Sequence, residues 1–140
     1  MTQFTDLTTV EFAFPGPLRD RLVESILTGT KTSTTSTLIE YEIENEQLPT
    51  VGDRLLVIDS LGAGVGVIEV TEVRIERLAD VDLAHAVDEG EGFASVSEWR
   101  RDHVAYWESP EMRTAMGDPD FTISSDSMLV LERFELIARL

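Results

Sequence analysis

Cysteine is absent from this chain of 140 residues, which excludes disulfide bonds, a thiol nucleophile and thiolate metal sites. Histidine is nearly as scarce, since His85 and His103 are the only two, and their spacing matches no zinc motif. We therefore expect no metal and no cofactor. No apolar run approaches the roughly 18 residues of a membrane-spanning helix, and residues 1–4 lack the basic and apolar regions of a signal peptide. These absences predict a cytoplasmic protein with no membrane partner.

Basic residues are also few: 11 lysines and arginines stand against 27 acidic residues, which gives a net charge of −16. A surface of this sign repels phosphate backbones at long range, so tight nonspecific binding of long DNA or RNA is disfavoured. The simplest interpretation is a solvated, solubilising surface. The charge still leaves room for a small nucleoside, or for a local basic pocket around Lys31, Arg54 or Arg100.

The chain indicates a single domain over residues 1–140, because that length and the 42% hydrophobic content suit one globular core. In the first half, alternation over residues 10–14 predicts a short strand. Pro17 then opens an amphipathic helix, which ends near Gly29. The threonine-rich residues 32–38 predict a strand or an extended loop.

The second half adds strands, helices and a long loop. The predicted elements are strands over Arg54–Ile58 and residues 65–75 joined as a hairpin, a short helix over 80–89, an acidic loop over 88–92, a helix capped by Ser95, a mostly irregular segment over 109–127 and a strand over 128–138. The last strand is apolar on both faces, which is typical of a central position. Trp99 and Tyr106 at helical spacing predict core packing rather than base stacking. Regular βαβ alternation is missing, so the order favours an α+β fold with a mainly antiparallel sheet or a small barrel.

One stretch concentrates chemical groups: residues 29–37 read GTKTSTTST. A lone lysine lies there among hydroxyl side chains, in a chain that is otherwise strongly acidic. A lysine at this place often serves only the dipole of the preceding helix, and a threonine run is often plain strand. If the protein has a site, we expect Lys31 to lie in it.

Several segments occur in the order and at the spacing of a known family. They read FPGPLRD (14–20), GTKTSTTS (29–36), LPTVGD (48–53), IEVTEV (68–73), EGEG (89–92), EWRRDH (98–103) and LERF (131–134). Together they span nearly all of the chain, which resembles the ASCH domain family. The resemblance implies a PUA-like β-barrel with flanking helices and a role connected with nucleic acids.

The resemblance also implies particular activities. PUA-like domains commonly bind RNA, some small bacterial ASCH proteins are amidohydrolases that remove acetyl from N(4)-acetylcytidine, and others are ribonucleases. The amidohydrolases use a lysine and a threonine from a G-x-K-x-x-T segment together with a later glutamate. Carried over, the catalytic residues are Lys31 and Thr34 with Glu89 or Glu91. Those enzymes place an arginine soon after the threonine, where this chain has only hydroxyl side chains at residues 35–37.

The residue types alone leave the roles in such a site open. A threonine hydroxyl is a weak nucleophile until a base removes its proton, and a lysine is a base only when it is neutral. A nearby glutamate would keep Lys31 charged, so that the lysine orients the substrate while the glutamate or a water acts as base. In a regular strand residues 31 and 34 face opposite sides. Thr35 shares the side of Lys31 and is therefore a rival to Thr34.

We predict a protein that binds a nucleoside, a nucleotide or an RNA element in a pocket at Lys31. Its enzymatic version hydrolyses the amide of an acylated cytidine. Ser36, Arg54 and Arg100 are the predicted substrate-binding residues, through hydroxyl and charge contacts. The alternatives are a noncatalytic RNA-binding or regulatory module and a ribonuclease. The acidic charge makes RNA binding less attractive than small-ligand binding.

Overall fold

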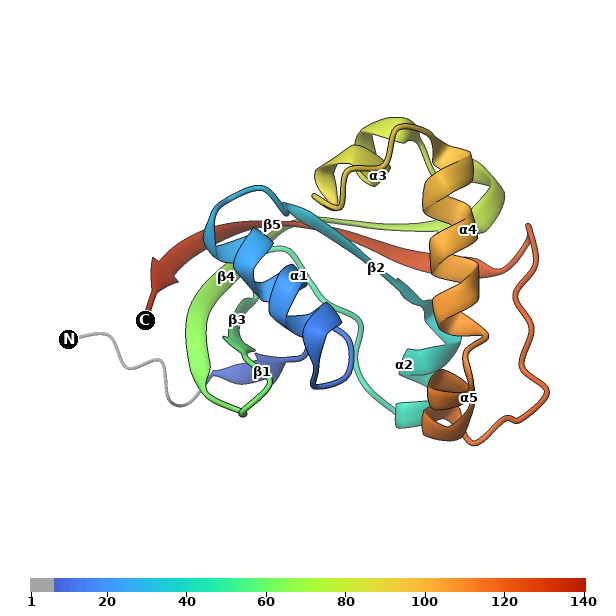
Figure 1. The fold of residues 1–140 in the computed structure, drawn as a ribbon, viewed down its shortest axis with the longest axis horizontal. Helices are drawn as coiled ribbons and strands as arrows, with labels where there is room; N and C mark the ends of the chain where they lie inside the picture. The colour runs from blue at the N-terminus through green and yellow to red at the C-terminus, as the bar shows by residue number, and fades with distance from the viewer. Residues whose placement is uncertain (1–6) are drawn as a thin grey trace.

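A five-stranded sheet organises residues 7–140, the part of the chain that the computed structural model describes (Figure 1). Its strands are β1 (Thr8–Val10), β2 (Ser33–Thr37), β3 (Arg54–Ile58), β4 (Gly64–Arg77) and β5 (Met128–Arg139). The strand order is β1-β3-β4-β5-β2, and every neighbouring pair is antiparallel except β1 with β3. The sheet is therefore open, with β1 and β2 at its edges. The predicted α+β fold around a mainly antiparallel sheet is confirmed.

Helices cover both faces of this sheet. They are α1 (Pro17–Leu27), α2 (Leu38–Glu44), α3 (Leu83–Asp88), α4 (Val96–Trp107) and α5 (Pro110–Met116), with a single 3-10 turn, η1 (Leu78–Asp80). Helix α1 packs through Ile26 into a cluster with Phe134 of β5, whereas α4 packs through Trp99 into a cluster with Leu131. Leu131 and Phe134 have opposite parity along β5, so the two clusters lie on opposite faces. Within residues 7–140, no helix has the length and apolar character to cross a membrane.

The central position of the last strand follows from its sequence. Three consecutive residues, Leu129, Val130 and Leu131, are buried, which requires cover on both faces. β5 pairs with β4 on one side and with β2 on the other. The central strand predicted over residues 128–138 is therefore confirmed.

The N-terminal strand lies earlier than residues 10–14, where the alternation predicted it. β1 ends at Val10, and the chain then turns through Ala13, which has a positive φ of 65°. The buried guanidinium of Arg19 fixes that turn by donating to the Ala13 carbonyl at 2.7 Å from Nη2. Phe12 consequently points into the core rather than continuing a strand. Residues 10–14 do alternate between apolar and other residues, but the turn that Arg19 of α1 holds at Ala13 prevents the strand from continuing.

The segment over 109–127, predicted to be mostly irregular, contains helix α5. Ser109 caps this helix, because its Oγ accepts from the backbone N–H of Met112 at 3.2 Å. Pro110 occupies the first helical turn, and Gly117 ends the helix with a φ of 69°. The Ser-Pro pair and the later glycine are sequence signals of a helix, although the seven residues between them show little periodicity.

β2 and α2 meet at a single residue. Glu40 Oε2 accepts from both the backbone N–H and the Oγ1 of Thr37, at 2.9 and 2.6 Å. This capping box ends the strand and starts the helix. The strand predicted over residues 32–38 is confirmed as β2, and its edge position leaves one side of it facing the helices.

Candidate active site

A cavity of about 990 Å³ lies beside β2, bordered by the chain around β1, by α1, α2, α4 and α5, and by the loop after α3. This volume is at the upper end of the range for small-molecule sites. Five predicted site residues line the cavity: Lys31, Thr34, Ser36, Glu89 and Glu91. The structure thus brings together the hydroxyl-rich segment and the acidic loop.

Lys31, the only lysine of the chain, is buried at this cavity with a side-chain exposure of 2%. Its Nζ lies 3.6 Å from Glu89 Oε1 and donates to the Ser33 carbonyl at 2.8 Å. Burial lowers the pKa of Lys31, and the charge of Glu89 opposes that shift. Lys31 is therefore a stronger acid than a surface lysine, and Glu89 is its charge partner.

Local backbone structure brings Lys31 and Glu89 together. Gly90 has a φ of 76°, and a Cβ at this position would lie 2.8 Å from the Thr30 carbonyl oxygen and 2.9 Å from Lys31 Cα. Only glycine permits this approach without a shift of backbone. The backbone N–H of Thr32 also donates to the Asp88 carbonyl at 2.8 Å. The end of α3 is thereby held against the chain that enters β2.

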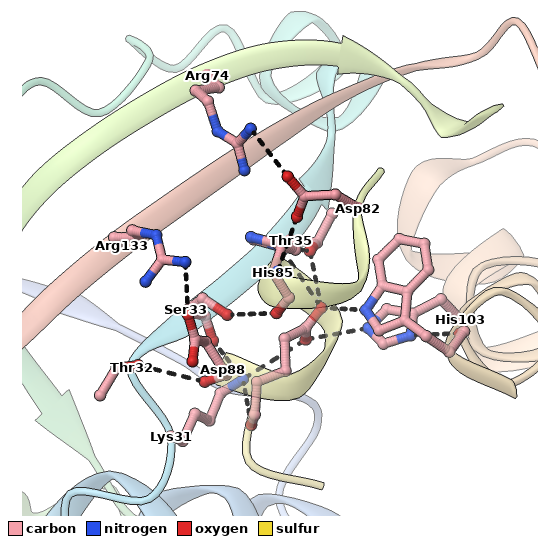
Figure 2. A network of polar contacts seen from close by, with 12 residues as sticks. Lys31, Thr32, Ser33, Thr35, Arg74, Asp82, His85, Asp88, His103 and Arg133 are labelled. Atoms are coloured by element: carbon pink, nitrogen blue, oxygen red, sulfur yellow. Dashed lines mark hydrogen bonds and ion pairs between the residues drawn. The ribbon is translucent and has the colours of Figure 1, made fainter. Parts of the chain in front are cut away.

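Ion pairs hold α3 against the sheet. Asp88 pairs with Arg133 of β5 at 2.5 Å, and Asp82 pairs with Arg74 of β4 at 3.7 Å (Figure 2). These contacts attach both ends of the short helix to neighbouring strands. The residue that follows the helix, Glu89, is positioned as a result.

Glu89 is the centre of the network. Its Oε2 accepts hydrogen bonds from Trp99 Nε1 and from Thr35 Oγ1, the latter at 2.9 Å. Its Oε1 faces His103 Nε2 at 3.1 Å. Burial by itself raises the pKa of this carboxyl, but the hydrogen bond from His103 and the charge of Lys31 outweigh it and lower the pKa to about 2. Glu89 is therefore ionised at neutral pH and is a weak base.

His103 is assigned as an imidazolium from its partners. Its Nδ1 lies 2.8 Å from the Trp99 carbonyl oxygen and its Nε2 lies 3.1 Å from Glu89. Both partners only accept, so both ring nitrogens carry hydrogen. Burial lowers the pKa of His103, but the contact with Glu89 raises it above the usual value overall. Figure 2 shows Lys31, Thr35 and His103 converging from the chain before β2, from β2 and from α4.

Thr35 is locked into this network by two partners. Its Oγ1 donates to Glu89 and lies 2.7 Å from His85 Nε2. Burial lowers the pKa of His85 to about 4, so the ring is neutral and its Nε2–H donates to the threonine oxygen. Ser33 Oγ in turn donates to the His85 carbonyl at 3.0 Å. The Thr35 hydroxyl is therefore held by the network.

Thr34 lies on the other face of β2. The ladder pairs Thr34 with Glu132 and Thr35 with Leu131 in an unbroken register, which confirms that the two threonines face opposite sides. Glu132 is 8% exposed and lines the same cavity. Burial, followed by the charge of Asp53, raises the pKa of Glu132 to about 7, against the opposing charge of Lys31.

Ser36 continues the Thr34 face toward α2. Ser36 and Tyr41 both line the cavity. Burial, reinforced by the charge of Glu132, raises the pKa of Tyr41, which therefore stays a neutral phenol. Ser36, a predicted substrate-binding residue, thus belongs to a second polar group in the cavity, with Thr34, Tyr41 and Glu132.

A sequence model of the ASCH domain matches residues 10–138. The chain belongs to the ASCH domain family. This family is PUA-like and is proposed to bind RNA. A search of curated proteins found no match.

Two solved structures share the fold of this ASCH domain over most of its length. An ASCH domain from Lactobacillus crispatus is 26% identical, with 95% of this chain and 80% of that chain covered and a TM-score of 0.79. A protein from Enterococcus faecalis is 24% identical, with 98% of this chain and 78% of that chain covered and a TM-score of 0.79.

Two predicted binding residues of the ASCH domain lie outside the cavity lining. Arg54 pairs with Glu69 across β3 and β4, with 3.1 Å between Nε and Oε1. Arg100 donates to Ser125 Oγ at 2.7 Å. Contact of either arginine with a ligand would require that ligand to extend beyond the cavity.

Several site residues were not assigned to the site from the sequence, among them His85, Trp99, His103 and Glu132. Trp99 and His103 are four residues apart on α4, a spacing that places them on one helix face. Core packing is the prediction for Trp99 and Tyr106, and no role in the site is predicted for His103. Trp99 is indeed in the core, but its indole N–H also binds Glu89. Glu132 had a signal, because it directly follows Leu129, Val130 and Leu131 in a strand predicted to be buried on both faces.

Glu89, Glu91 and His103 are the residues best placed to hold a metal ion within residues 7–140. Each offers one ligand atom, and these atoms lie within 4.8 Å of one another. A cation there would compete with the Lys31 ammonium and with the imidazolium of His103, both already on Glu89. The donor set therefore fits a metal ion poorly, because its charge is already neutralised.

Acidic side chains dominate the cavity lining. The carboxylates are Glu11, Glu40, Glu44, Glu46, Glu89, Glu91, Asp102 and Glu132, and the lysine and arginines are Arg19, Arg21 and Lys31. Arg19 is engaged by the Ala13 and Asp59 carbonyls. The cavity lining, like the whole chain, therefore carries more negative than positive charges.

Proposed function

We propose that this ASCH domain is an amidohydrolase that removes the acyl group from an acylated cytidine in the cavity at Lys31. The observation that carries the proposal is the buried Lys31–Glu89 pair, with 3.6 Å between Nζ and Oε1, at the edge of a cavity that Thr34 also lines. A buried charge pair of this kind is a costly arrangement for stability alone. Perturbed, buried ionisable groups in a cavity are typical of catalytic sites.

Lys31 is the group that stabilises negative charge on the substrate. Its strongest hydrogen bond, to the Ser33 carbonyl at 2.8 Å, orients the ammonium, while its contacts with Glu89 are longer, at 3.4 and 3.6 Å. One N–H can therefore turn toward a substrate carbonyl oxygen as that oxygen becomes an oxyanion. Glu89 keeps the ammonium charged between turnovers.

Thr34, or a water that it positions, is the nucleophile. Thr34 lines the cavity on the face opposite the Glu89 network, whereas the Thr35 hydroxyl is committed to Glu89 and His85. Glu89, with a pKa of about 2, is too weak a base to activate either hydroxyl near neutral pH. Proton transfer needs a carboxylate of higher pKa. Two carboxyls of the cavity meet this condition, because burial raises the pKa of both Glu91 and Glu132.

The charge of the lining favours an uncharged nucleoside as substrate. A phosphate group entering the cavity would approach several carboxylates of its lining. RNA binding, which is proposed for the family, and the ribonuclease alternative both require a phosphate backbone to do so. A noncatalytic module would need no buried lysine beside the cavity.

The test is hydrolysis of N(4)-acetylcytidine, followed by chromatographic detection of cytidine. We expect turnover of the nucleoside, slower turnover of its 5′-monophosphate, and loss of at least about 100-fold of the activity in Lys31→Met and in Thr34→Val. Arg54→Gln, which lies outside the cavity lining, is the matched control and should retain activity. Absence of turnover in the unmodified protein, or full activity in Lys31→Met, would refute the proposal.

A further inference from the structure

Glu132 is a buried carboxyl without a charged partner. It is 8% exposed and follows three buried apolar residues, 129–131, in the central strand β5. Among residues 7–140, no lysine, arginine or histidine lies within ion-pair distance of it, whereas Glu89 contacts Lys31 and both histidines. An unpaired ionisable group inside a protein lowers stability, and such groups gather where chemistry is done. Packing does not account for a glutamate at this position.

The sheet register places Glu132 next to Thr34. The two residues are direct partners across β2 and β5, and their side chains therefore share one face. Side chains paired in this way have Cβ atoms about 5 Å apart. Both residues line the cavity, as does Lys31. The hydroxyl, the carboxyl and the ammonium thus border the same space from three segments of the chain.

We propose that Glu132 is the catalytic acid–base residue of the amide hydrolysis in this cavity. This inference rests on the proposed function and goes beyond it by assigning the proton transfers. The carboxylate of Glu132 takes the proton of the nucleophile, Thr34 Oγ1–H or a water, as the oxygen attacks the acyl carbon. The C=O π-electrons move to the oxygen, which becomes an oxyanion beside Lys31.

The same proton then completes the reaction. As the oxyanion re-forms the carbonyl, the C–N bond breaks, and the carboxylic acid of Glu132 gives its proton to the leaving amine nitrogen of the cytosine. If Thr34 is the nucleophile, a water adds to the acyl ester in the same manner, with its proton passing through Glu132 to Thr34 Oγ1. One amide and one water give one amine and one carboxylic acid, and Glu132 ends as it began.

The surroundings of Glu132 suit a group that exchanges protons near neutral pH. Four ionisable groups act on it or near it: Lys31 from the chain before β2, Asp53 from the chain before β3, Tyr41 from α2, and Glu89 through Lys31. Burial is the main cause of the raised pKa of about 7, Asp53 adds to it, and Lys31 opposes it. A carboxyl in this range is both a competent base and a competent acid. Glu91 is its rival, because its pKa is also raised, but it lies on the loop after α3 and not opposite Thr34.

The experiment compares Glu132→Gln with two matched variants under steady-state N(4)-acetylcytidine hydrolysis. Glu135→Gln changes an exposed residue of the same strand, and Glu91→Gln removes the rival carboxyl. We expect kcat of Glu132→Gln to fall by about 100-fold or more, with KM changed by less than about threefold. In the unmodified protein kcat/KM should rise through pH 7, and this rise should vanish in Glu132→Gln but persist in both other variants. Glu132→Asp, which keeps the carboxyl, should recover part of the activity.

Each outcome of this experiment either supports or overturns the assignment of Glu132. Activity of Glu132→Gln within about threefold of the unmodified protein, or loss of the pH 7 ionisation in Glu91→Gln instead, would overturn the assignment while leaving the hydrolase intact. No turnover of the unmodified protein would overturn both proposals together. If circular dichroism shows that Glu132→Gln is unfolded, the pH profiles of the unmodified protein and of Glu132→Asp decide: an ionisation near pH 7 that moves in Glu132→Asp supports the assignment, and an unmoved or absent one refutes it.

Discussion

Two glutamates of one cavity differ in almost every physical respect. Glu89 receives donors from Trp99, Thr35 and His103 and faces Lys31, and its pKa falls to about 2. Glu132 is buried without a cationic partner in residues 7–140, and its pKa rises to about 7. Identical side chains are thus given different chemistry by their partners alone.

The contrast separates two tasks that a single carboxylate performs badly. A fixed negative charge must resist protonation, which requires many donors, while a proton carrier must accept and release a proton readily, which requires few. Glu89 suits the first task, because it retains the Lys31 ammonium in a buried place. Glu132 suits the second.

The largest effect is expected for Glu89→Gln. This change leaves the Lys31 ammonium and the His103 imidazolium buried without a counter-charge, so the free energy of unfolding should fall by about 3–5 kcal/mol. Urea denaturation at pH 7 measures the fall, with Glu135→Gln on the exposed surface of β5 as the control. A loss below about 1 kcal/mol would mean that the network is not organised around Glu89.

Glu132→Gln should act on stability in the opposite sense, and only at higher pH. The folded pKa of about 7 lies above the ordinary value of 4.5, so the unmodified protein loses stability as pH rises from 4.5 toward 7. Glutamine does not titrate. The stability of Glu132→Gln relative to the unmodified chain should therefore increase by about 3 kcal/mol between pH 4 and pH 8. Urea denaturation at both pH values tests this, and a difference independent of pH contradicts it.

Gly90→Ala should separate Glu89 from Lys31. Both Gly90 and Gly92 have positive φ, at 76° and 81°, but only at Gly90 does a Cβ meet backbone atoms of the Thr30–Lys31 segment. Gly92→Ala is therefore the control for backbone strain alone. We expect Gly90→Ala to be less stable than Gly92→Ala by about 2 kcal/mol, measured by thermal denaturation. Equal stabilities would show that the approach of the two segments is easily relaxed.

The smallest changes in stability are expected for substitutions of the two threonines, Thr34 and Thr35. Thr35→Val removes a hydrogen bond to ionised Glu89 and should lower the free energy of unfolding by about 1.5 kcal/mol. Thr34→Val should change stability by less than about 0.5 kcal/mol while abolishing turnover of N(4)-acetylcytidine. Denaturation and hydrolysis assays on the same samples give both numbers. The reverse pattern would exchange the roles of the two hydroxyls.

Much of this arrangement follows from the sequence. The helix before Gly29, the strand after Lys31 and the central last strand come from local periodicity, and strand alternation places Thr34 and Thr35 on opposite faces. The expectation that Lys31, Thr34 and the acidic loop would share a site came from the family resemblance. All of them line one cavity, while their catalytic roles stay predictions.

The rest depends on contacts between distant segments, which periodicity does not encode. Thr34 and Glu132 are neighbours only because β2 pairs with β5. Arg54 and Arg100 were predicted to bind substrate from their charge alone, but their side chains pair with Glu69 and Ser125 instead. The short helix α5 was missed because seven residues give two turns, too few to show a period. The pKa values of Glu89 and Glu132 diverge through partners that lie far away in sequence.

The burial of the sole lysine has a practical consequence. Amine-directed reagents, such as N-hydroxysuccinimide esters or formaldehyde with a reductant, find no ε-amino group on the surface of residues 7–140. Apart from the α-amino group, every adduct must form at Lys31 inside the cavity. Labelling kinetics followed by mass spectrometry therefore report how often that hollow admits small molecules, and a bound nucleoside should slow them.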